Sequence, residues 1–255
     1  MRITILASGS KGNATLFETA TTRLLVDAGV GVRALQTLVP RIDVLLITHA
    51  HSDHVGYYER IARKLKARVL MTEATRRAVE PVREVETCES RGSFAVRDLA
   101  ITLMPLPHDA AQVGVVVSDG LHRAALLTDL GEVPPGLVEQ LAGCEALLVE
   151  ANHDRTMLDE GPYREGLKLR IRGPGGHLSN DQTRALLTAH YQQARPRRGA
   201  HTVVLMHLSE VNNTPRRALD TCRSALPQDT TLLAAPPRGP LVLDLARGPA
   251  QQWLW

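Results

Sequence analysis

The chain has 255 residues, of which 44% are hydrophobic, so it can bury a core of ordinary size. Its net charge is +3, and its three cysteines lie far apart without a C-x-x-C pattern, which excludes a disulfide framework and favours a reducing cytoplasm. It shows no signal peptide and no apolar run of about 18 residues, so we expect a cytoplasmic protein with no membrane partner.

The first part of the chain alternates short apolar runs with glycine-bearing turns. We expect strands at Arg2–Leu6, Thr15–Glu18, Thr22–Val26 and Val44–Ile47, and a short helix at Val32–Leu38. In the turn after the first strand, Ser8, Ser10 and Asn13 are candidate substrate contacts, because such a loop can place backbone N–H groups beside a ligand. A plain hairpin turn explains this loop equally well. Asp27 ends the third strand and could hydrogen-bond the next loop from behind.

The densest group of candidate ligands follows Val44–Ile47, an apolar run typical of a strand buried on both faces. Directly after it come His49, His51, Asp53 and His54. The first two are two residues apart, so in an extended segment both imidazoles point the same way. The other two are adjacent and can face a second point as the chain turns. The spacing therefore suits two metals side by side better than one tetrahedral site. An exposed polar loop that is merely histidine-rich is the less favoured interpretation, because scattered histidines rarely follow a buried strand in this pattern.

The rest of the chain alternates strands and helices, with no repeat and no linker that would divide it, so we expect a single domain over residues 1–255. The expected strands are Arg68–Met71, Ser93–Arg97, Leu99–Leu106, Gln112–Ser118, His122–Leu127, Ala146–Glu150, Thr202–Met206, Thr231–Leu233 and Leu241–Leu245. The expected helices are Val55–Leu65, Glu73–Glu80, Pro134–Leu141, Tyr163–Ile171, Asp181–Tyr191 and Thr214–Ser224. The basic residues on Val55–Leu65 are interpreted as a solvated face.

Three further candidate ligands follow expected strands directly. They are His108, Asp129 and His207, and His177 is a rival to the last of them. Asn180 is a good N-cap for the helix after His177, and a helix N-terminus can bind phosphate.

Several motifs together resemble a known family. T-H-A-H-S-D-H resembles the H-x-H-x-D-H motif of the metallo-β-lactamase superfamily, which implies the α/β class and a four-layer αββα sandwich. S-G-S-K-G-N, E-A-N-H-D, G-H-L-S-N and H-L-S-E-x-N-N resemble the YycJ/WalJ family of RNase Z-like nucleases and extend the likeness from Ser8 to Asn213. Ala50 departs from the family, where glutamate is common; strand alternation turns this position away from the metals.

This resemblance implies two divalent metal ions, Zn²⁺ or Mn²⁺, which would activate a hydroxide for attack on phosphorus. The implied ligands are His49, His51 and His108 for one ion and Asp53, His54 and His207 for the other, with Asp129 bridging. Asp53 or Asp129 would orient the hydroxide, and His177 would protonate the leaving oxygen. His153 or Glu150 would steady His177, while Ser179, Asn180 and the Ser8–Asn13 loop would contact phosphate.

The function that the resemblance implies is a cytosolic 5′-to-3′ DNA exonuclease associated with mismatch repair. The alternatives are an RNase Z-like ribonuclease and a small-molecule phosphodiesterase or thioester hydrolase of the same fold. An arginine-rich surface around Arg164–Arg172 and Arg195–Arg198 would contact nucleic acid, although genomic base composition also enriches arginine. The sequence indicates no particular oligomeric state.

Overall fold

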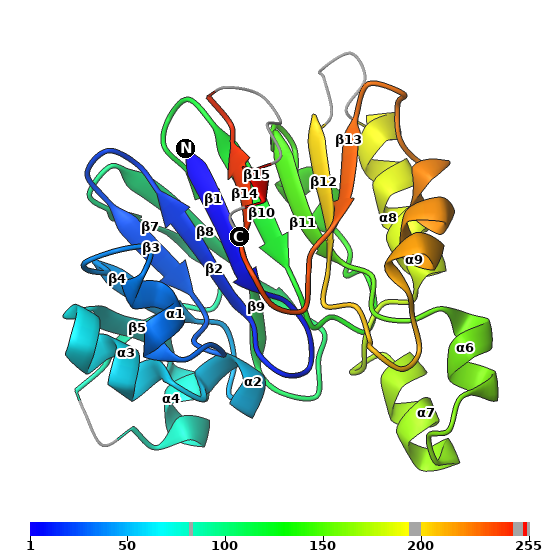
Figure 1. Cartoon of the computed structure of the whole chain (residues 1–255), viewed down its shortest axis with the longest axis horizontal. Helices are drawn as coiled ribbons and strands as arrows, with labels where there is room; N and C mark the ends of the chain where they lie inside the picture. The colour runs from blue at the N-terminus through cyan, green and yellow to red at the C-terminus, as the bar shows by residue number, and fades with distance from the viewer. Residues whose placement is uncertain (82–83, 194–199, 247–251, 254–255) are drawn as a thin grey trace. The chain divides into compact units, whose positions relative to one another are not determined.

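The computed structural model describes residues 1–81, 84–193, 200–246 and 252–253, which form two compact units (Figure 1). Unit 1 comprises Met1–Pro105, Ala110–His122 and Pro236–Trp255, and unit 2 comprises Leu106–Asp109 and Arg123–Ala235. A single domain over the whole chain stays a prediction.

Unit 1 contains an eight-stranded mixed sheet with the strand order β15-β14-β1-β2-β3-β4-β5-β6. Its strands are β1 (Arg2–Ala7), β2 (Ala14–Glu18), β3 (Arg23–Val26), β4 (Val44–Ile47), β5 (Arg68–Thr72), β6 (Glu86–Cys88), β14 (Leu241–Asp244) and β15 (Gln252–Trp253). Pairing is antiparallel from β15 to β3 and parallel from β3 to β6. Three more strands of this unit are neighbours: β7 (Gly92–Val96), β8 (Leu99–Leu106) and β9 (Gln112–Ser118).

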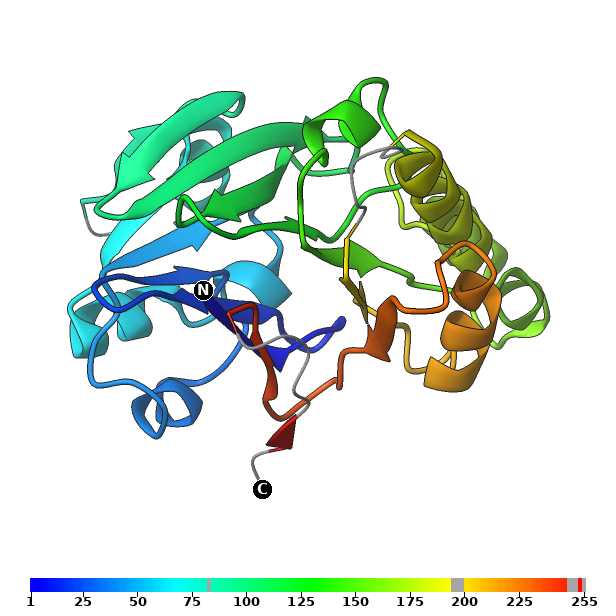
Figure 2. The same cartoon turned by 90° about the horizontal axis from the view of Figure 1, so that it is seen from above.

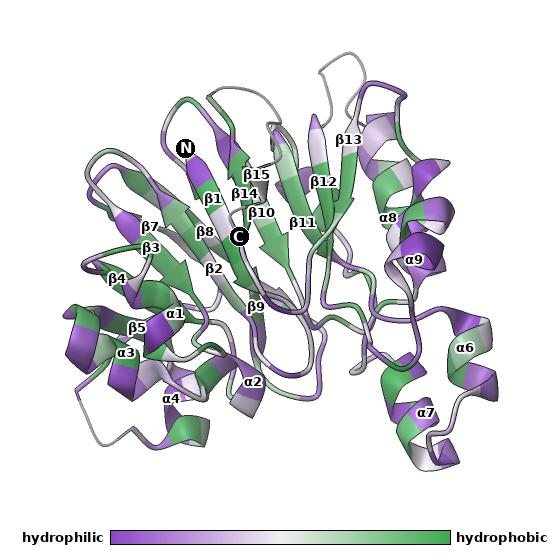
Figure 3. Ribbon diagram, in the orientation of Figure 1, coloured by the Kyte–Doolittle hydropathy of each residue, from purple (hydrophilic) through white to green (hydrophobic). Residues whose placement is uncertain are grey.

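The helices of unit 1 cover the strand that carries the histidine motif. They are α1 (Val32–Gln36), α2 (Ser52–Val55), α3 (Tyr58–Leu65) and α4 (Glu73–Val79). All four residues of β4 are buried, and Leu45 and Ile47 belong to the same core cluster as Leu35 of α1 and Ile61 of α3. The central strands are mostly hydrophobic with polar residues near their ends, whereas the helices carry hydrophobic and hydrophilic residues side by side (Figure 3).

Unit 2 is built on four parallel strands, β10 (Arg123–Leu127), β11 (Ala146–Glu150), β12 (Thr202–Met206) and β13 (Thr231–Ala234). Its helices are α5 (Leu137–Gln140), α6 (Arg155–Glu160), α7 (Glu165–Arg172), α8 (Asn180–Gln193) and α9 (Pro215–Arg223), of which α8 and α9 lie side by side (Figures 1 and 2). Parallel strands end at one edge, so residues that follow β10, β11 and β12 are brought together. No helix in the described ranges is long and apolar enough to cross a membrane.

The structure departs from the expected elements at a few places. The expected helix Val55–Leu65 is two helices, because the Tyr57 N–H donates to the Ala28 carbonyl oxygen at 2.9 Å instead of continuing α2. The expected helix at Pro134–Leu141 is shortened to α5, because Gly136 before it is left-handed with φ 80°. Strand β6 and helix α6 were not predicted; β6 is too short, at three residues, to show a pattern.

The first testable consequence concerns β4. We expect Leu45→Ala to lower the free energy of unfolding by about 2–5 kcal/mol, because it leaves a cavity in a fully buried strand. Leu121→Ala, at a position that is 84% exposed, is the matched control and should change it by less than about 0.5 kcal/mol. Urea unfolding of both variants measures the difference, and equal stabilities would contradict this description of the core.

Candidate metal centre

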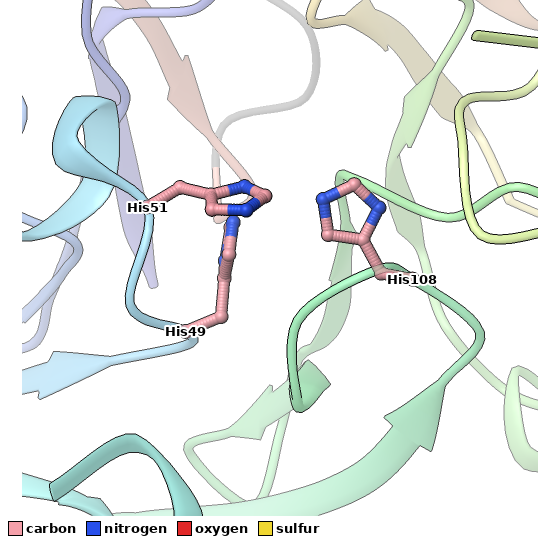
Figure 4. A group of neighbouring side chains, drawn as sticks. All are labelled: His49, His51 and His108. Carbon is pink, nitrogen blue, oxygen red and sulfur yellow. The ribbon is translucent and has the colours of Figure 1, made fainter. Parts of the chain in front are cut away.

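The first group of predicted ligands lies in unit 1, in the segment that follows β4. The rings of His49 and His51 approach each other, with their centroids 4.7 Å apart (Figure 4). The centroids of His49 and His54 are 4.1 Å apart, and both of these side chains are fully buried. Asp53 is partly exposed at the start of α2. The segment thus gathers three imidazoles and leaves a carboxylate near the surface.

A buried carboxylate, Asp27, holds this segment from behind. Its Oδ1 accepts a hydrogen bond from the Thr48 backbone N–H at 2.9 Å, and its Oδ2 lies 2.7 Å from Nδ1 of His54. A carboxylate only accepts, so the proton of His54 is on Nδ1 and the lone pair is on Nε2. Asp27 itself is left-handed, with φ 64°, a conformation that non-glycine residues adopt at specific functional positions. The role expected for Asp27 from the sequence is therefore observed, whereas Thr48 was not singled out.

Asn13 braces the same segment from the Ser8–Asn13 loop. Its Nδ2 lies 3.1 Å from Oδ2 of Asp53 and 2.9 Å from Nε2 of His54, and its backbone N–H donates to the Asp53 carbonyl oxygen at 2.8 Å. A Cβ on Gly29 would lie 2.0 Å from that carbonyl oxygen, so only glycine fits there. Ser8 and Asn13 are buried and Ser10 is exposed, so among the three predicted substrate contacts only Ser10 presents its side chain to solvent.

The second group lies in unit 2 and is organised by Glu150, the last residue of β11. Oε1 of Glu150 is 2.8 Å from Nδ1 of His207 and 2.9 Å from Nδ1 of His177. Its Oε2 accepts hydrogen bonds from the backbone N–H groups of Leu130 and Leu178, each at 3.1 Å. One carboxylate therefore orients two imidazoles.

Asp129 and His207 both adopt the left-handed conformation directly after their strands, with φ values of 57° and 54°. Oδ1 of Asp129 lies 3.4 Å from Nδ1 of His207 and 3.6 Å from Nδ1 of His177. Asp129, Glu150, His177 and His207 offer ligand atoms that all lie within 4.8 Å of one another. Since such conformations are strained for non-glycine residues, the surrounding strands must hold both side chains in place.

In this group the negative charge of Glu150 and the positive charge of a protonated His177 stabilise each other. Burial raises the pKa of the Glu150 carboxyl, but the adjacent His177 and His207 outweigh it and lower that pKa to about 2. Burial lowers the pKa of His177, but the charge of Glu150 and its hydrogen bond outweigh this effect and raise it. The pair therefore favours an ionised carboxylate beside a protonated imidazole.

His177 lies between two other imidazoles of unit 2. Its ring centroid is 5.3 Å from that of His108 and 5.1 Å from that of His207. His108 extends from the loop after β8 (Figure 4), and its Nδ1 lies 3.0 Å from the Gly176 carbonyl oxygen, so Nε2 carries its lone pair. His177 is 22% exposed and His207 only 3%. The more exposed imidazole is suited to substrate and the more buried one to a metal.

The sequence predicted that either His153 or Glu150 would steady His177. In the structure Glu150 makes this bond. His153 is buried; its carbonyl oxygen accepts from the Asn180 N–H at 2.8 Å, and its Nδ1 has no partner among the residues the structure describes. Burial lowers the pKa of His153 to about 4, so it is neutral. A catalytic role for His153 stays a prediction.

The expected N-cap of α8 is corrected by one residue. Ser179, not Asn180, caps the helix: its Oγ accepts from the Gln182 N–H at 3.3 Å, and Gln182 Oε1 accepts from the Ser179 N–H at 2.9 Å. Asn180 is the first helical residue and exchanges hydrogen bonds with the side chain of Asn213. The side chains of Ser179 and Asn180 are both buried and hydrogen-bonded within the protein. The contact with phosphate that was predicted for these two residues stays a prediction.

The arginine-rich surface expected around Arg164–Arg172 is largely neutralised by acidic neighbours. Arg170 pairs with Asp109 at 2.6 Å and Arg172 with Asp159 at 3.2 Å. The second expected stretch, Arg195–Arg198, lies outside the described residues. The surface of α7 is therefore less cationic than its sequence suggests.

Comparison with known proteins gives the family. Residues 22–208 match the Beta-lactamase superfamily domain. The chain is 32% identical to exodeoxyribonuclease WalJ of Streptococcus pneumoniae, over 89% of this chain and 88% of that protein. The chain belongs to the WalJ/YycJ family of the metallo-β-lactamase superfamily. It is 31% identical to exodeoxyribonuclease YycJ of Bacillus anthracis, over 71% of this chain and 74% of that one.

The fold prediction is confirmed by structural likeness. The metallo-β-lactamase fold protein YhfI of Bacillus subtilis superimposes with a TM-score of 0.75 at 15% identity, covering 95% of this chain and 99% of that one. The chain thus has the metallo-β-lactamase fold. The family match and the two exodeoxyribonuclease relatives make it a hydrolase of that superfamily.

The residues in each unit fit divalent metal ions. Neutral imidazoles whose second nitrogen bonds a carboxylate or a carbonyl are common metal ligands, because that bond fixes the tautomer and raises the basicity of the ligating nitrogen. His54 has Asp27, His207 has Glu150 and His108 has the Gly176 carbonyl in this position. A mixed imidazole and carboxylate set suits Zn²⁺ and also Mn²⁺.

The contact between Asp27 and His54 gives a second prediction. We expect Asp27→Asn to weaken divalent-metal affinity by about 10–100-fold, because a neutral amide polarises the imidazole less than a carboxylate does. Asp98→Asn, an exposed carboxylate of the same unit, is the control and should leave affinity unchanged. Metal titration calorimetry measures both, and wild-type affinity in Asp27→Asn would contradict the role of this contact.

Proposed function

We propose that the chain is a metal-dependent exodeoxyribonuclease that degrades DNA from a 5′ end with the aid of two divalent ions. The observation that carries the proposal is the shared bond of Glu150 to His177 and His207. It places a partly exposed, proton-bearing imidazole beside a buried imidazole suited to a metal. The exodeoxyribonuclease names of the two bacterial relatives support DNA as the substrate.

We propose that the two groups of ligands described for the units bind the ions together. The proposed ligands are His49, His51, Asp53, His54, His108, Asp129 and His207, with Asp129 shared. The order of the motif, the position of each residue after a strand and the fixed tautomers support this set. His177 is left out of the set because it is 22% exposed against 3% for His207, although both rings bond Glu150, and its greater exposure suits contact with substrate.

Bound divalent ions would lower the pKa of a water nucleophile and neutralise charge on the phosphate. The protein supplies the proton for the leaving group. His177 holds a proton on Nδ1 toward Glu150, and its raised pKa favours a second proton on Nε2, which the ring donates to the departing 3′ oxygen. Glu150 stays ionised and stabilises the imidazolium without taking its proton, while Asp53 or Asp129 orients the water.

We propose that the protein acts in the cytoplasm, which the three free cysteines support. The association with mismatch repair belongs to the same proposal and depends on the family resemblance alone. On this basis the protein should start at the 5′ end of a nick and degrade past a mismatch in a circular duplex.

The substrate is tested with 5′- and 3′-labelled single- and double-stranded DNA and RNA, in Mn²⁺ and in Zn²⁺. We expect a 5′-labelled DNA strand to release its labelled nucleotide first, and a chelator to abolish the reaction. The rate should also fall steeply with salt if phosphate contacts dominate binding. Intact DNA together with rapid cleavage of RNA, or of a thioester, would show that one of the alternative hydrolase activities is correct.

The roles of the two Glu150-bound histidines give a further prediction. We expect His177→Ala to keep both metals and near-normal DNA affinity but to react about 10²–10⁴-fold more slowly, the usual contribution of a general acid. His207→Ala should instead lose one metal. Metal analysis and single-turnover rates of the two variants decide the matter: loss of metal in His177→Ala, or full activity there, contradicts the assignment.

A further inference from the structure

The side chain of Tyr57 stands out on the surface of unit 1. It is 44% exposed, more than any other phenylalanine, tyrosine or tryptophan side chain among the residues whose burial the structure describes. Its neighbour Tyr58 is buried, with its hydroxyl hydrogen-bonded to Glu59. Tyrosine is enriched at binding interfaces, so an exposed ring in a chain with only 3% aromatics is a candidate contact for a partner.

The backbone fixes the position of Tyr57 relative to the metal motif. The Ala28 N–H donates to the His54 carbonyl oxygen at 2.6 Å, and the Ala28 carbonyl oxygen accepts from the Tyr57 N–H at 2.9 Å. A single residue thus holds both the proposed ligand and the start of α3. Tyr57 is therefore anchored next to the ligand segment and does not lie on a separate loop.

Two arginines follow Tyr57 along one face of α3, at the helical spacing of three residues. Arg60 and Arg63 are exposed, and in the described part of the chain neither has an ion pair. By contrast, the exposed Arg170 and Arg172 of α7 each form an ion pair with an aspartate. These two guanidinium groups keep their charge available for an anionic partner.

Tyr57, Arg60 and Arg63 line one surface hollow of about 650 Å³. Glu59 also lines it, and its carboxylate accepts a hydrogen bond from the Tyr58 hydroxyl at 3.0 Å. The hollow thus combines an exposed aromatic ring with two guanidinium groups and one carboxylate, so its arginines outnumber its acidic groups. Sequence-tolerant binding of single-stranded nucleic acid uses this combination, with a base on the aromatic ring and phosphates on the cations.

We propose that Tyr57, Arg60 and Arg63 form a platform for single-stranded nucleic acid, on which one base stacks against the ring and the backbone phosphates lie along the arginines. The platform would position a strand beside the ligand segment of unit 1. This inference rests on the proposed nuclease function, because it assigns a contact for that substrate. Its chemistry is independent of base sequence, as an exonuclease that degrades any sequence requires.

The test is the binding of fluorescent phosphorothioate oligonucleotides, which resist hydrolysis, to the metal-loaded full chain. Tyr57→Ala should weaken binding by about 5- to 100-fold, the usual effect of removing one stacking contact, whereas Tyr57→Phe keeps the ring and should bind like the wild type. An abasic site moved along the strand should weaken wild-type binding at one position and leave Tyr57→Ala insensitive there. Arg60→Gln and Arg63→Gln should each reduce the salt dependence of binding by about one phosphate contact.

Leu121→Ala and Arg33→Gln, at exposed positions in other parts of unit 1, are the controls and should bind like the wild type. If the wild type degrades DNA but Tyr57→Ala binds equally well, or responds to the abasic site as the wild type does, the platform is wrong and the nuclease proposal stands. If the wild type neither binds nor degrades oligonucleotides, both proposals are wrong.

Discussion

The proposed chemistry depends on one buried carboxylate, Glu150, and on the two imidazoles that share it. An isolated buried charge is costly, and here two backbone N–H groups and two histidine nitrogens offset that cost. The same bonds determine which nitrogen of each ring is presented elsewhere. The two rings differ in exposure. Glu150 can therefore orient the buried His207 toward a metal and the more exposed His177 toward substrate.

Asp27 repeats this arrangement in unit 1, where it holds the Nδ1 proton of His54. Both carboxylates are almost completely buried, and both lie at the end of a strand. Placing them there lets the rigid sheet, rather than a loop, set the direction of each imidazole. Three non-glycine residues in left-handed conformation at strand ends, Asp27, Asp129 and His207, show that this direction is held against local backbone preference.

The elements that carry the candidate site could be predicted from the sequence, because each is a continuous apolar run followed by polar residues. β4, β11 and β12 have the predicted bounds. What could not be predicted depends on contacts between distant segments. The split between α2 and α3 depends on the Ala28 carbonyl. The capping role of Ser179 depends on the side chain of Gln182, whereas the sequence had predicted Asn180 as the cap.

The same limit applies to Asn13. Its amide type and its loop indicated a substrate contact, whereas the structure shows it bound to Asp53 and His54. Local sequence shows which atoms a residue offers, but the fold decides which atoms they meet. The signal that could have revealed the bracing role is Gly29, whose lack of a side chain allows the two loops to approach.

We have proposed that seven residues, without His177, bind two metal ions. A crystal structure of the metal-loaded protein with anomalous scattering data tests it most directly. We expect two anomalous peaks about 3.5–4 Å apart, with His207 on one ion and His177 still bonded to Glu150. A single peak, or a peak coordinated by His177 in place of His207, would contradict it.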